Sequence, residues 1–492
     1  MSEAENHFRK FRKGIIGIDA TMEGALGRVP LVYADWIASG RQYGPIEERL
    51  HASVYPWVAN THSESSALGA GMTAAYRKSH AVIRERVGGR DSDIVITTGS
   101  GMTGVVNKLQ RILGLRVPER ARSLCVDIAE KDRPVVFLTH MEHHSNHTSW
   151  IETIADVVVL EPDDRLRVDP EELRRQLVRY ADRPLKIGSF SAGSNVTGVR
   201  PPFRELARLM HEAGGLAFVD FAASAPYDPI AMNPAGDEAG RLDAVFFSPH
   251  KFLGGPGSPG VLVFDSSIYE NSIPDDPGGG TVSWTNRWGE RSYVSDIEAR
   301  EDGGTPAFLG SIRAALALEL KAVMGERAMR EREEELLALV FDRLSMIDGL
   351  RILAAGERER LGVVSFFIES LHFNLVVRLL SDRWGIQVRG GCSCAGTYGH
   401  YLLHVDRARS HSIACSIDSG DLSDKPGWVR LSLHPTMSDD EADYILRAID
   451  EVARKGSDWA DDYRFDRRRG EYVRIDGRDF SPVDTDSLFK IG

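Results

Sequence analysis

Between about residues 92 and 265, short runs of β-branched and other apolar residues alternate with amphipathic stretches. Seven of these runs have the length and composition of strands: residues 94–97, 135–140, 156–160, 186–190, 216–220, 244–247 and 260–264. The clearest helix among them starts after Asp169, a suitable N-cap that is followed by Pro170 and Glu172. Strands that alternate with helices predict an α/β fold with a mainly parallel sheet.

A second, smaller unit is expected after this region. Two Gly-rich segments, 277–281 and 302–306, lead into a long polar helical stretch over about 309–344. Beyond it, two strands and a final helix indicate an α+β unit: 363–368, 428–433 and 438–453. The expected domains are a large α/β domain over 60–320, a small α+β domain from 1–59 plus 321–460, and a C-terminal extension over 461–492.

Composition limits the classes of protein to which the chain can belong. With 492 residues, of which 42% are hydrophobic and 27% charged, it has the balance of an ordinary globular protein. A net charge of −12 argues against a nucleic-acid binder, which needs Lys and Arg to neutralise phosphates. Because we find neither a membrane span nor a secretion signal, we expect a cytoplasmic protein with reduced thiols at Cys125, Cys392, Cys394 and Cys415.

A lysine and an acid follow two of the expected strands. In AVFFSPHKFLGGPGSPGVLVF, a strand ends in Ser248, His250 and Lys251, and a Gly-rich loop comes next. Asp220 ends the apolar strand of LAFVDFAAS, where a buried carboxylate needs a cation beside it. The protonated ring nitrogen of pyridoxal 5′-phosphate (PLP) is such a cation, and the ring can then draw electrons from the Cα of an amino acid. Taken alone, Lys251 also fits a surface loop and Asp220 a strand-end cap.

A tight turn between a strand and a helix comes earlier in the chain. In IVITTGSGMTGVVNKL, Gly99, Ser100 and Gly101 form the turn, and a helix is expected to start near Met102. Backbone N–H groups at a helix start, together with the positive end of the helix dipole, form a phosphate site. Such turns are common, but the order of phosphate turn, acid and lysine is not. Together these features predict a PLP site in which Lys251 holds the cofactor.

These motifs resemble those of the class V aminotransferase family of fold type I PLP-dependent enzymes, in particular its cysteine desulfurase and selenocysteine lyase branch. The similarity covers about residues 33–453 and implies a mostly parallel seven-stranded sheet in the large domain. It also implies roles within the cofactor site: His143 of THMEHHSNHTSW stacks on the PLP ring, Asn195 of SAGSNVTGVRPP lies near the phenolic oxygen and the substrate carboxylate, Asp220 partners the pyridine nitrogen, Ser248 and His250 bind the phosphate, and Lys251 is the Schiff-base lysine.

Motifs outside the expected sheet resemble the same family. His62 in NTHSE would lie close to the substrate, and Arg430 in VRLSLHPTMSDDEADYIL would bind its α-carboxylate through two parallel hydrogen bonds. Thr305 in GGTP would reach the phosphate of a neighbouring protomer, which implies a homodimer. In VRGGCSCAG, Arg389 occupies the position of the family's preceding arginine, and Cys394 that of the desulfurase nucleophile.

The resemblance therefore implies a desulfurase-like reaction on a small amino acid. Lys251 would remove the Cα proton, and the Cys394 thiolate would take sulfur from bound cysteine, giving alanine and a persulfide that an acceptor protein or small molecule collects. Two departures favour a second reading, a class V lyase, epimerase or transferase that acts on another amino acid. Ala223 stands where desulfurases have a glutamine that contacts the cofactor oxygen, and the segment 397–427 is longer than expected.

Three further readings stay open at this point. Cys392, Cys394, His400 and His404 have a spacing that could bind zinc, although metal-binding cysteines more often come as C-x2-C. The histidines at 140, 143, 144 and 147 could also suggest a metal, but the stacking role of His143 explains them better, and we expect no metal site. The chain could also be a non-catalytic PLP-fold protein that acts by binding partners.

Overall fold

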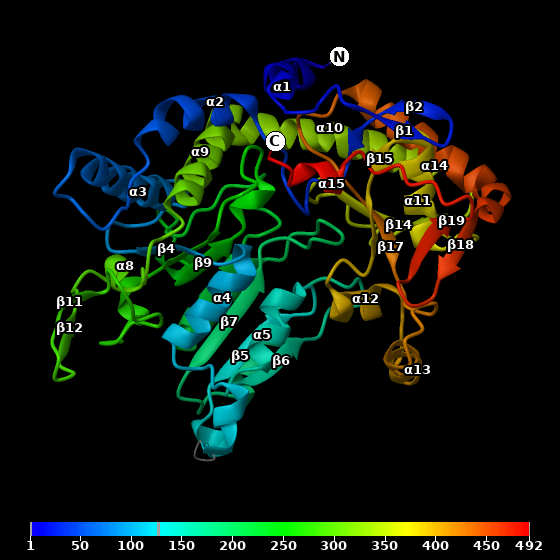
Figure 1. Ribbon diagram of the computed structural model, residues 1–492. Coiled ribbons are helices and arrows are strands. Elements are labelled where there is room, and N and C mark those ends of the chain that lie inside the picture. Colours follow the sequence, from blue (N-terminus) through cyan, green and yellow to red (C-terminus); the bar gives the residue numbers. More distant parts are fainter. Residues whose placement is uncertain (1, 125–127, 492) are drawn as a thin grey trace. The chain divides into compact units, whose positions relative to one another are not determined.

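The computed structural model describes residues 2–124 and 128–491, so Cys125 lies outside the described residues. The chain divides into two compact units: a larger one of residues 39–194 and 200–326, and a smaller one of residues 1–38, 195–199 and 327–492. Figure 1 shows both units coloured along the sequence. This division differs from the expected domains at four places. Residues 39–59 and 321–326 belong to the larger unit, and residues 195–199 and 461–492 belong to the smaller unit.

Side-chain contacts explain the two longest of these differences, at residues 39–59 and 461–492. In the larger unit, helix α2 (Gly44–Ser53) is fixed by Glu47, which forms an ion pair with Arg313 of helix α9 (Phe308–Met324). In the smaller unit, the hairpin of β18 (Tyr463–Asp466) and β19 (Glu471–Arg474) packs on helix α11 (Phe373–Trp384). The last segment of the chain therefore contributes to the smaller unit instead of forming a separate extension.

The larger unit is built on a seven-stranded sheet. Its strands are β4 (Ile94–Thr98), β5 (Val135–Thr139), β6 (Asp156–Leu160), β7 (Lys186–Ser191), β8 (Leu216–Asp220), β9 (Ala244–Phe247) and β10 (Gly260–Phe264). They lie in the order β4-β10-β9-β8-β7-β5-β6, and only β10 runs antiparallel to its neighbours. All seven expected strands form, with ends that differ by no more than one residue, and the predicted mostly parallel α/β fold is confirmed.

Helices cover the sheet and explain its apolar composition. The remaining elements of this unit are α3 (Ala67–Arg86), α4 (Gly101–Ile112), α5 (Thr148–Ile151), α6 (Pro170–Arg179), α7 (Phe203–Glu212), α8 (Ile297–Arg300) and the hairpin of β11 (Val282–Thr285) and β12 (Arg291–Tyr293). Figure 1 shows α4 and α5 against one face of the sheet, where Val105, Leu109 and Trp150 meet Phe218 and Phe246 in the core. Every residue of β5 is buried, as expected for a strand covered on both faces.

The smaller unit has a four-stranded antiparallel sheet in the order β13-β14-β17-β16. Its elements are α1 (Glu3–Lys13), β1 (Thr21–Gly24), β2 (Gly27–Pro30), β3 (Val32–Tyr33), α10 (Glu326–Leu344), β13 (Leu350–Ile352), β14 (Val363–Ile368), β15 (Ile386–Gln387), β16 (Arg389–Gly391), α12 (Gly396–Leu402), α13 (Arg407–Asp418), β17 (Trp428–Ser432), α14 (Asp439–Trp459) and α15 (Thr485–Leu488), besides α11, β18 and β19. This arrangement agrees with the expected α+β character.

The polar stretch over 309–344 is two helices instead of one. Gly325, with a φ of +84°, separates α9 from α10, because a glycine in the left-handed region ends the first helix. Across residues 2–124 and 128–491, no helix combines the length and the apolar character that crossing a membrane requires.

Candidate active site

The turn before α4 brings the predicted phosphate ligands of the larger unit together. Gly99 and Gly101 have φ values of +63° and +60°, which fold the chain sharply between β4 and α4. The Ser248 hydroxyl accepts a hydrogen bond of 2.8 Å from the N–H of Met102, so a residue far along the chain caps this helix. A Cβ on Gly101 would lie 2.8 Å from the Cε1 atom of His250 and 2.8 Å from the Ser248 hydroxyl. Only glycine fits this concave turn.

A buried ion cluster fixes α4 behind the turn. The Lys108 ammonium lies 2.9 Å from Asp276 and 2.9 Å from Glu301, and Arg111 donates to Asp275 at 2.8 Å. The Lys108 and Glu301 side chains are almost fully buried, so both charges depend on this pairing. Asp276 and Glu301 stand just before the two Gly-rich segments, and the cluster therefore ties those segments to the phosphate turn. Sequence reasoning missed the cluster, because its members are far apart in the chain.

Asp220 lies at the end of β8 in an environment that favours a nearby cation. Its side chain is buried and accepts one hydrogen bond of 2.7 Å from the N–H of Ala222. Burial raises the pKa of Asp220 to about 6, and the positive charge of Lys251 opposes this rise. Burial likewise lowers the pKa of His250 to about 4, and Lys251 adds to that effect. The predicted acid and lysine are thus close enough to interact through their charges. A further cation beside Asp220 would stabilise its charged carboxylate.

Glu142 is a buried acid of this site that the sequence analysis missed. Its carboxyl accepts hydrogen bonds from the Thr139 hydroxyl at 2.6 Å, the Asn146 amide at 2.7 Å and the N–H of Ser191 at 2.9 Å. Burial raises the pKa of Glu142 to about 8, and the charge of Asp220 acts in the same direction. A charged residue directly before His143, after an apolar strand, was the signal that could have identified it.

His143 and Ala223 are the remaining two residues that were expected beside the cofactor ring. The Nδ1 atom of His143 accepts a hydrogen bond of 3.1 Å from the N–H of Ser145, which fixes the orientation of the imidazole. Ala223 is buried, and its methyl group offers no hydrogen bond in place of the glutamine amide found in desulfurases.

The two Gly-rich segments meet beside His62. The N–H of Gly304 donates to the carbonyl of Gly279 at 2.8 Å, and the His62 Nε2 atom lies 2.6 Å from the Gly304 carbonyl. Gly280 has a φ of +89°, and a Cβ there would lie 2.7 Å from the His62 ring. Thr305 follows directly and is exposed. The structure thus brings His62 and the Thr305 loop together on one surface of the larger unit.

In the smaller unit, Asp35 joins the two arginines expected to bind substrate. Arg430, with only 4% of its side chain exposed, donates from Nη2 to Asp35 at 2.8 Å, and Arg389 lies 2.9 Å from the other Asp35 oxygen. Burial lowers the pKa of Arg430. The charge and hydrogen bond of Asp35 are the largest of the effects that raise this pKa again. Two guanidinium groups share one carboxylate, so the cluster has an excess positive charge that suits an anionic group. Asp35 was not anticipated from the sequence.

Asn195 connects this cluster to the cysteine segment. Its backbone carbonyl accepts a hydrogen bond of 3.2 Å from Arg430, and its side-chain amide donates to the carbonyl of Ser393 at 2.7 Å. Cys394 is exposed, and it lies close enough to Arg430 for the two side chains to interact electrostatically. The structure thus brings Asn195, Arg389, Arg430 and Cys394 together in the smaller unit. The hydrogen bond from the Asn195 amide to Ser393 fixes the loop that carries Cys394.

The zinc reading finds no support in the geometry. Both ring nitrogens of His400 are hydrogen-bonded, Nδ1 to the carbonyl of Gly396 at 2.7 Å and Nε2 to the hydroxyl of Ser410 at 2.8 Å. In the described part of the chain, no group of three or more His, Cys, Asp and Glu side chains is arranged to hold a metal ion. The segment 397–427 instead contains α12 and α13, and α13 buries none of its residues.

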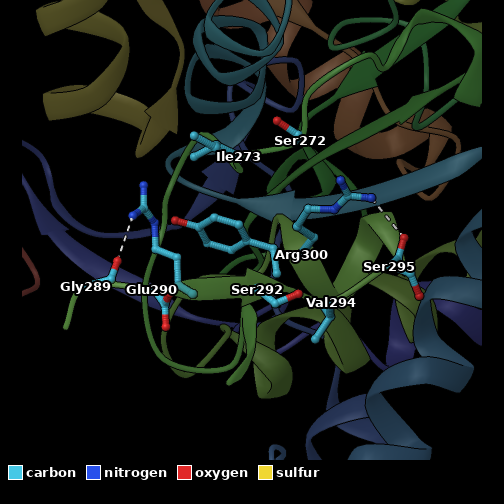
Figure 2. A pocket seen from close by; sticks show the side chains of 10 residues that line it. Ser272, Ile273, Gly289, Glu290, Ser292, Val294, Ser295 and Arg300 are labelled. Atoms are coloured by element: carbon cyan, nitrogen blue, oxygen red, sulfur yellow. Dashed lines mark hydrogen bonds between the residues drawn. The ribbon is translucent and has the colours of Figure 1, made fainter. Parts of the chain in front are cut away.

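An open depression beside the β11–β12 hairpin is separate from these residues. Figure 2 shows it lined by Ser272, Ile273, residues 289–295 and Arg300, and its volume is about 780 Å³. Arg300 points to the Ser295 carbonyl and donates to it at 2.9 Å. It includes none of the predicted site residues, so we assign it no part in the chemistry.

The seven-stranded sheet, the capped glycine turn, the buried acid and the neighbouring lysine define the class of fold type I PLP enzymes. Within this class, the chain belongs to the class V aminotransferase family, whose sequence pattern matches residues 32–445. The expected family membership is thereby confirmed.

Curated relatives and solved structures agree with this assignment. The chain is 28% identical to a probable cysteine desulfurase of Halalkalibacterium halodurans over 387 residues, which covers 77% of this chain and 88% of the relative. It is 27% identical to a cysteine desulfurase of Haloferax volcanii over 373 residues, with 74% and 81% covered. A cysteine desulfurase structure from Thermococcus onnurineus has the same fold, with a TM-score of 0.71, 21% identity and coverage of 90% and 98%.

Proposed function

We propose that this chain is a PLP-dependent enzyme that converts L-cysteine to L-alanine and transfers the sulfur to Cys394 as a persulfide. The observation that carries the proposal is the position of Cys394, an exposed thiol on a loop that Asn195 ties to the buried Arg430. Family membership and the desulfurase relatives support the same reaction.

The larger unit offers groups that fit PLP. The turn from Ser100 to Met102, with Ser248 and His250 beside it, is a concave surface that a Cβ at Gly101 would fill, and it would serve as the anion site for the phosphate. Asp220, with its raised pKa, would be satisfied by the protonated pyridine nitrogen. Lys251 would carry the cofactor, and His143 would lie against the ring.

The residues of this chain would then divide the reaction among them. Arg430 and Arg389 would bind the substrate carboxylate, with His62 near the substrate. PLP, when bound, would supply the electron sink for the Cα carbon. The amine of Lys251 would remove the Cα proton, and the Cys394 thiolate would attack the substrate sulfur. The net change is balanced, because cysteine and a thiol give alanine and a persulfide.

A second candidate is a class V lyase, epimerase or transferase that acts on another amino acid without a nucleophilic thiol. The observation that favours it is Ala223, which is buried and cannot make the hydrogen bond of the usual glutamine. Lys251 and Asp220 would keep their roles in this reaction.

Two partners follow from the proposal. Thr305 lies in an exposed loop, and its proposed contact with the phosphate of a second copy requires a homodimer. A persulfide on Cys394 requires a thiol acceptor, and the exposed position of Cys394 would allow a protein to serve as one.

The test is a product assay with PLP-loaded protein and L-cysteine. In a single turnover we expect alanine and transferred sulfur in equal amounts, with the sulfur counted as protein-bound sulfane sulfur plus any released sulfide. Both products should be lost in Cys394→Ser. Cys415→Ser, which removes an exposed thiol of the same unit, is the matched control and should behave as wild type. Pyruvate in place of alanine, or full turnover by Cys394→Ser, would replace the desulfurase proposal with the second candidate.

A further inference from the structure

Cys392 and Cys394 belong to one tight turn. The N–H of Ala395 donates to the carbonyl of Cys392 at 3.0 Å, which closes a four-residue turn. Its two central residues, Ser393 and Cys394, have φ values of +51° and +57°. Side chains other than Gly, Asn and Asp rarely adopt this left-handed conformation, and two in succession are rarer still. The turn is therefore kept at an energetic cost.

The surrounding contacts maintain this turn. Asn195 donates to the Ser393 carbonyl at 2.7 Å, and Arg430, paired with Asp35, donates to the Asn195 carbonyl at 3.2 Å. Strain that is kept by a dedicated set of contacts is typical of functional segments.

The turn brings the Cα atoms of the two cysteines close together. Cys392 and Cys394 are its first and third residues, and a folded turn places such Cα atoms about 5–6 Å apart, which lies within the range of a disulfide. Both cysteines are thiols in the structure; Cys394 is exposed and Cys392 half-buried. The proposed desulfurase reaction uses Cys394 and leaves Cys392 without a part.

We propose that Cys392 is a resolving thiol for Cys394. Its thiolate attacks the Sγ atom of a sulfur-substituted Cys394, a Cys392–Cys394 disulfide forms, and the outer group leaves with the electron pair. From a Cys394 persulfide the leaving group is hydrosulfide, so the outer sulfur is reduced and the two thiols are oxidised. An external thiol reductant then restores both cysteines. The origin of the persulfide rests on the proposed function, but the exchange itself does not.

Thiol exchange tests this proposal without any enzymatic activity. The probe is a single equivalent of 5,5′-dithiobis(2-nitrobenzoate), added to PLP-loaded protein in which Cys125 and Cys415 are replaced by Ser. We expect release of both thionitrobenzoate groups and a protein mass about 2 Da lower than that of the reduced chain, as an internal disulfide requires. Cys392→Ser should release one group and keep the other on Cys394. Retention of the adduct in both proteins would overturn the proposal.

A second measurement links the exchange to the substrate. After one turnover of L-cysteine without reductant, wild type should release sulfide and contain the disulfide, whereas Cys392→Ser should keep its persulfide at least tenfold longer. Cys392→Ala is the second variant, and matching thermal midpoints show that the fold is kept. Alanine without a disulfide would contradict the resolving role alone. Disulfide formation with the probe but no alanine would contradict the proposed function alone.

Discussion

Individual buried charged side chains indicate which ligand groups this protein could bind. Asp220 lies in the larger unit with a raised pKa, and in the smaller unit Asp35 is shared by Arg389 and Arg430. A buried charge costs free energy unless a partner compensates it, so each of these groups indicates what a ligand would have to supply. The first would accept a cation and the second an anion.

The pH dependence of stability tests the environment of Asp220. Its pKa is raised from 3.8 to about 6 in the folded protein without cofactor, so its ionisation opposes folding. Stability should therefore fall as the pH rises from about 4 to about 6 and then level off. Asp220→Asn removes this loss, and at pH 7 the cofactor-free variant should be more stable than wild type by up to about 3 kcal/mol.

Thermal or urea unfolding of both cofactor-free proteins between pH 4.5 and 8 measures this difference. Towards the acidic end the difference in stability between the two proteins should narrow to about 1 kcal/mol at pH 4.5, which serves as the internal control. Addition of PLP should reverse the order at pH 7, because only the aspartate can pair with the pyridine nitrogen. A constant difference across the pH range would contradict the argument.

Replacement of Asp35 should leave the positive charges of Arg389 and Arg430 without their counter-charge. In Asp35→Asn the buried Arg430 loses its counter-charge, and we expect a loss of about 3 kcal/mol in the free energy of unfolding. L-alanine, whose carboxylate can take the place of Asp35, should raise the melting temperature of the variant more than that of wild type. Asp19→Asn, at an exposed site of the same unit, is the control and should change neither quantity.

Among the elements, the strand–turn–helix from β4 to α4 forms the proposed phosphate site. The helix depends on three distant contributions: the Ser248 cap, the close approach of His250 to Gly101, and the ion cluster around Lys108. The sequence predicted the turn and a helix start near Met102, one residue after the observed start at Gly101. It could not predict the cap, because Ser248 follows β9, a strand far along the chain from α4.

Two glycine substitutions distinguish the effect of backbone strain on stability from the effect of the shape of the turn on PLP affinity. Gly101 and Gly114 both have left-handed φ values, +60° and +70°, so alanine at either site should cost about 1 kcal/mol of stability. A Cβ at Gly101 would collide with His250 and Ser248, whereas a Cβ at Gly114 would have nothing within 4 Å. We expect PLP affinity, measured by absorbance titration, to fall more than tenfold in Gly101→Ala and to stay unchanged in Gly114→Ala. Equal affinities would mean that the turn does not bind the phosphate.

For the whole molecule, the proposed homodimer makes a prediction about mixed assemblies. If Thr305 of one copy contacts the phosphate bound by the other, each site of the dimer takes Lys251 from one chain and Thr305 from its partner. Lys251→Ala and Thr305→Arg then inactivate a site through different chains. Each variant alone should be inactive with L-cysteine. After unfolding and refolding together in equal amounts, half of the dimers should be mixed and carry one intact site, which restores about a quarter of the wild-type activity. No recovery, although the mixed dimer is present by mass, would place Thr305 and Lys251 in the same protomer's site.

The sequence by itself determined the elements and the family. Strand periodicity predicted the seven strands within one residue, because buried parallel strands are continuous apolar runs with clear ends. The motifs around Lys251, Asp220 and Cys394 identified the family, because they are local in the chain. Only the tertiary structure revealed the partners of the buried charged groups. It showed the environments of Glu142, Asp35 and Lys108, which contact residues distant in sequence. It also placed Cys392 and Cys394 in a strained turn, because that strain is sustained by Asn195 from almost two hundred residues away.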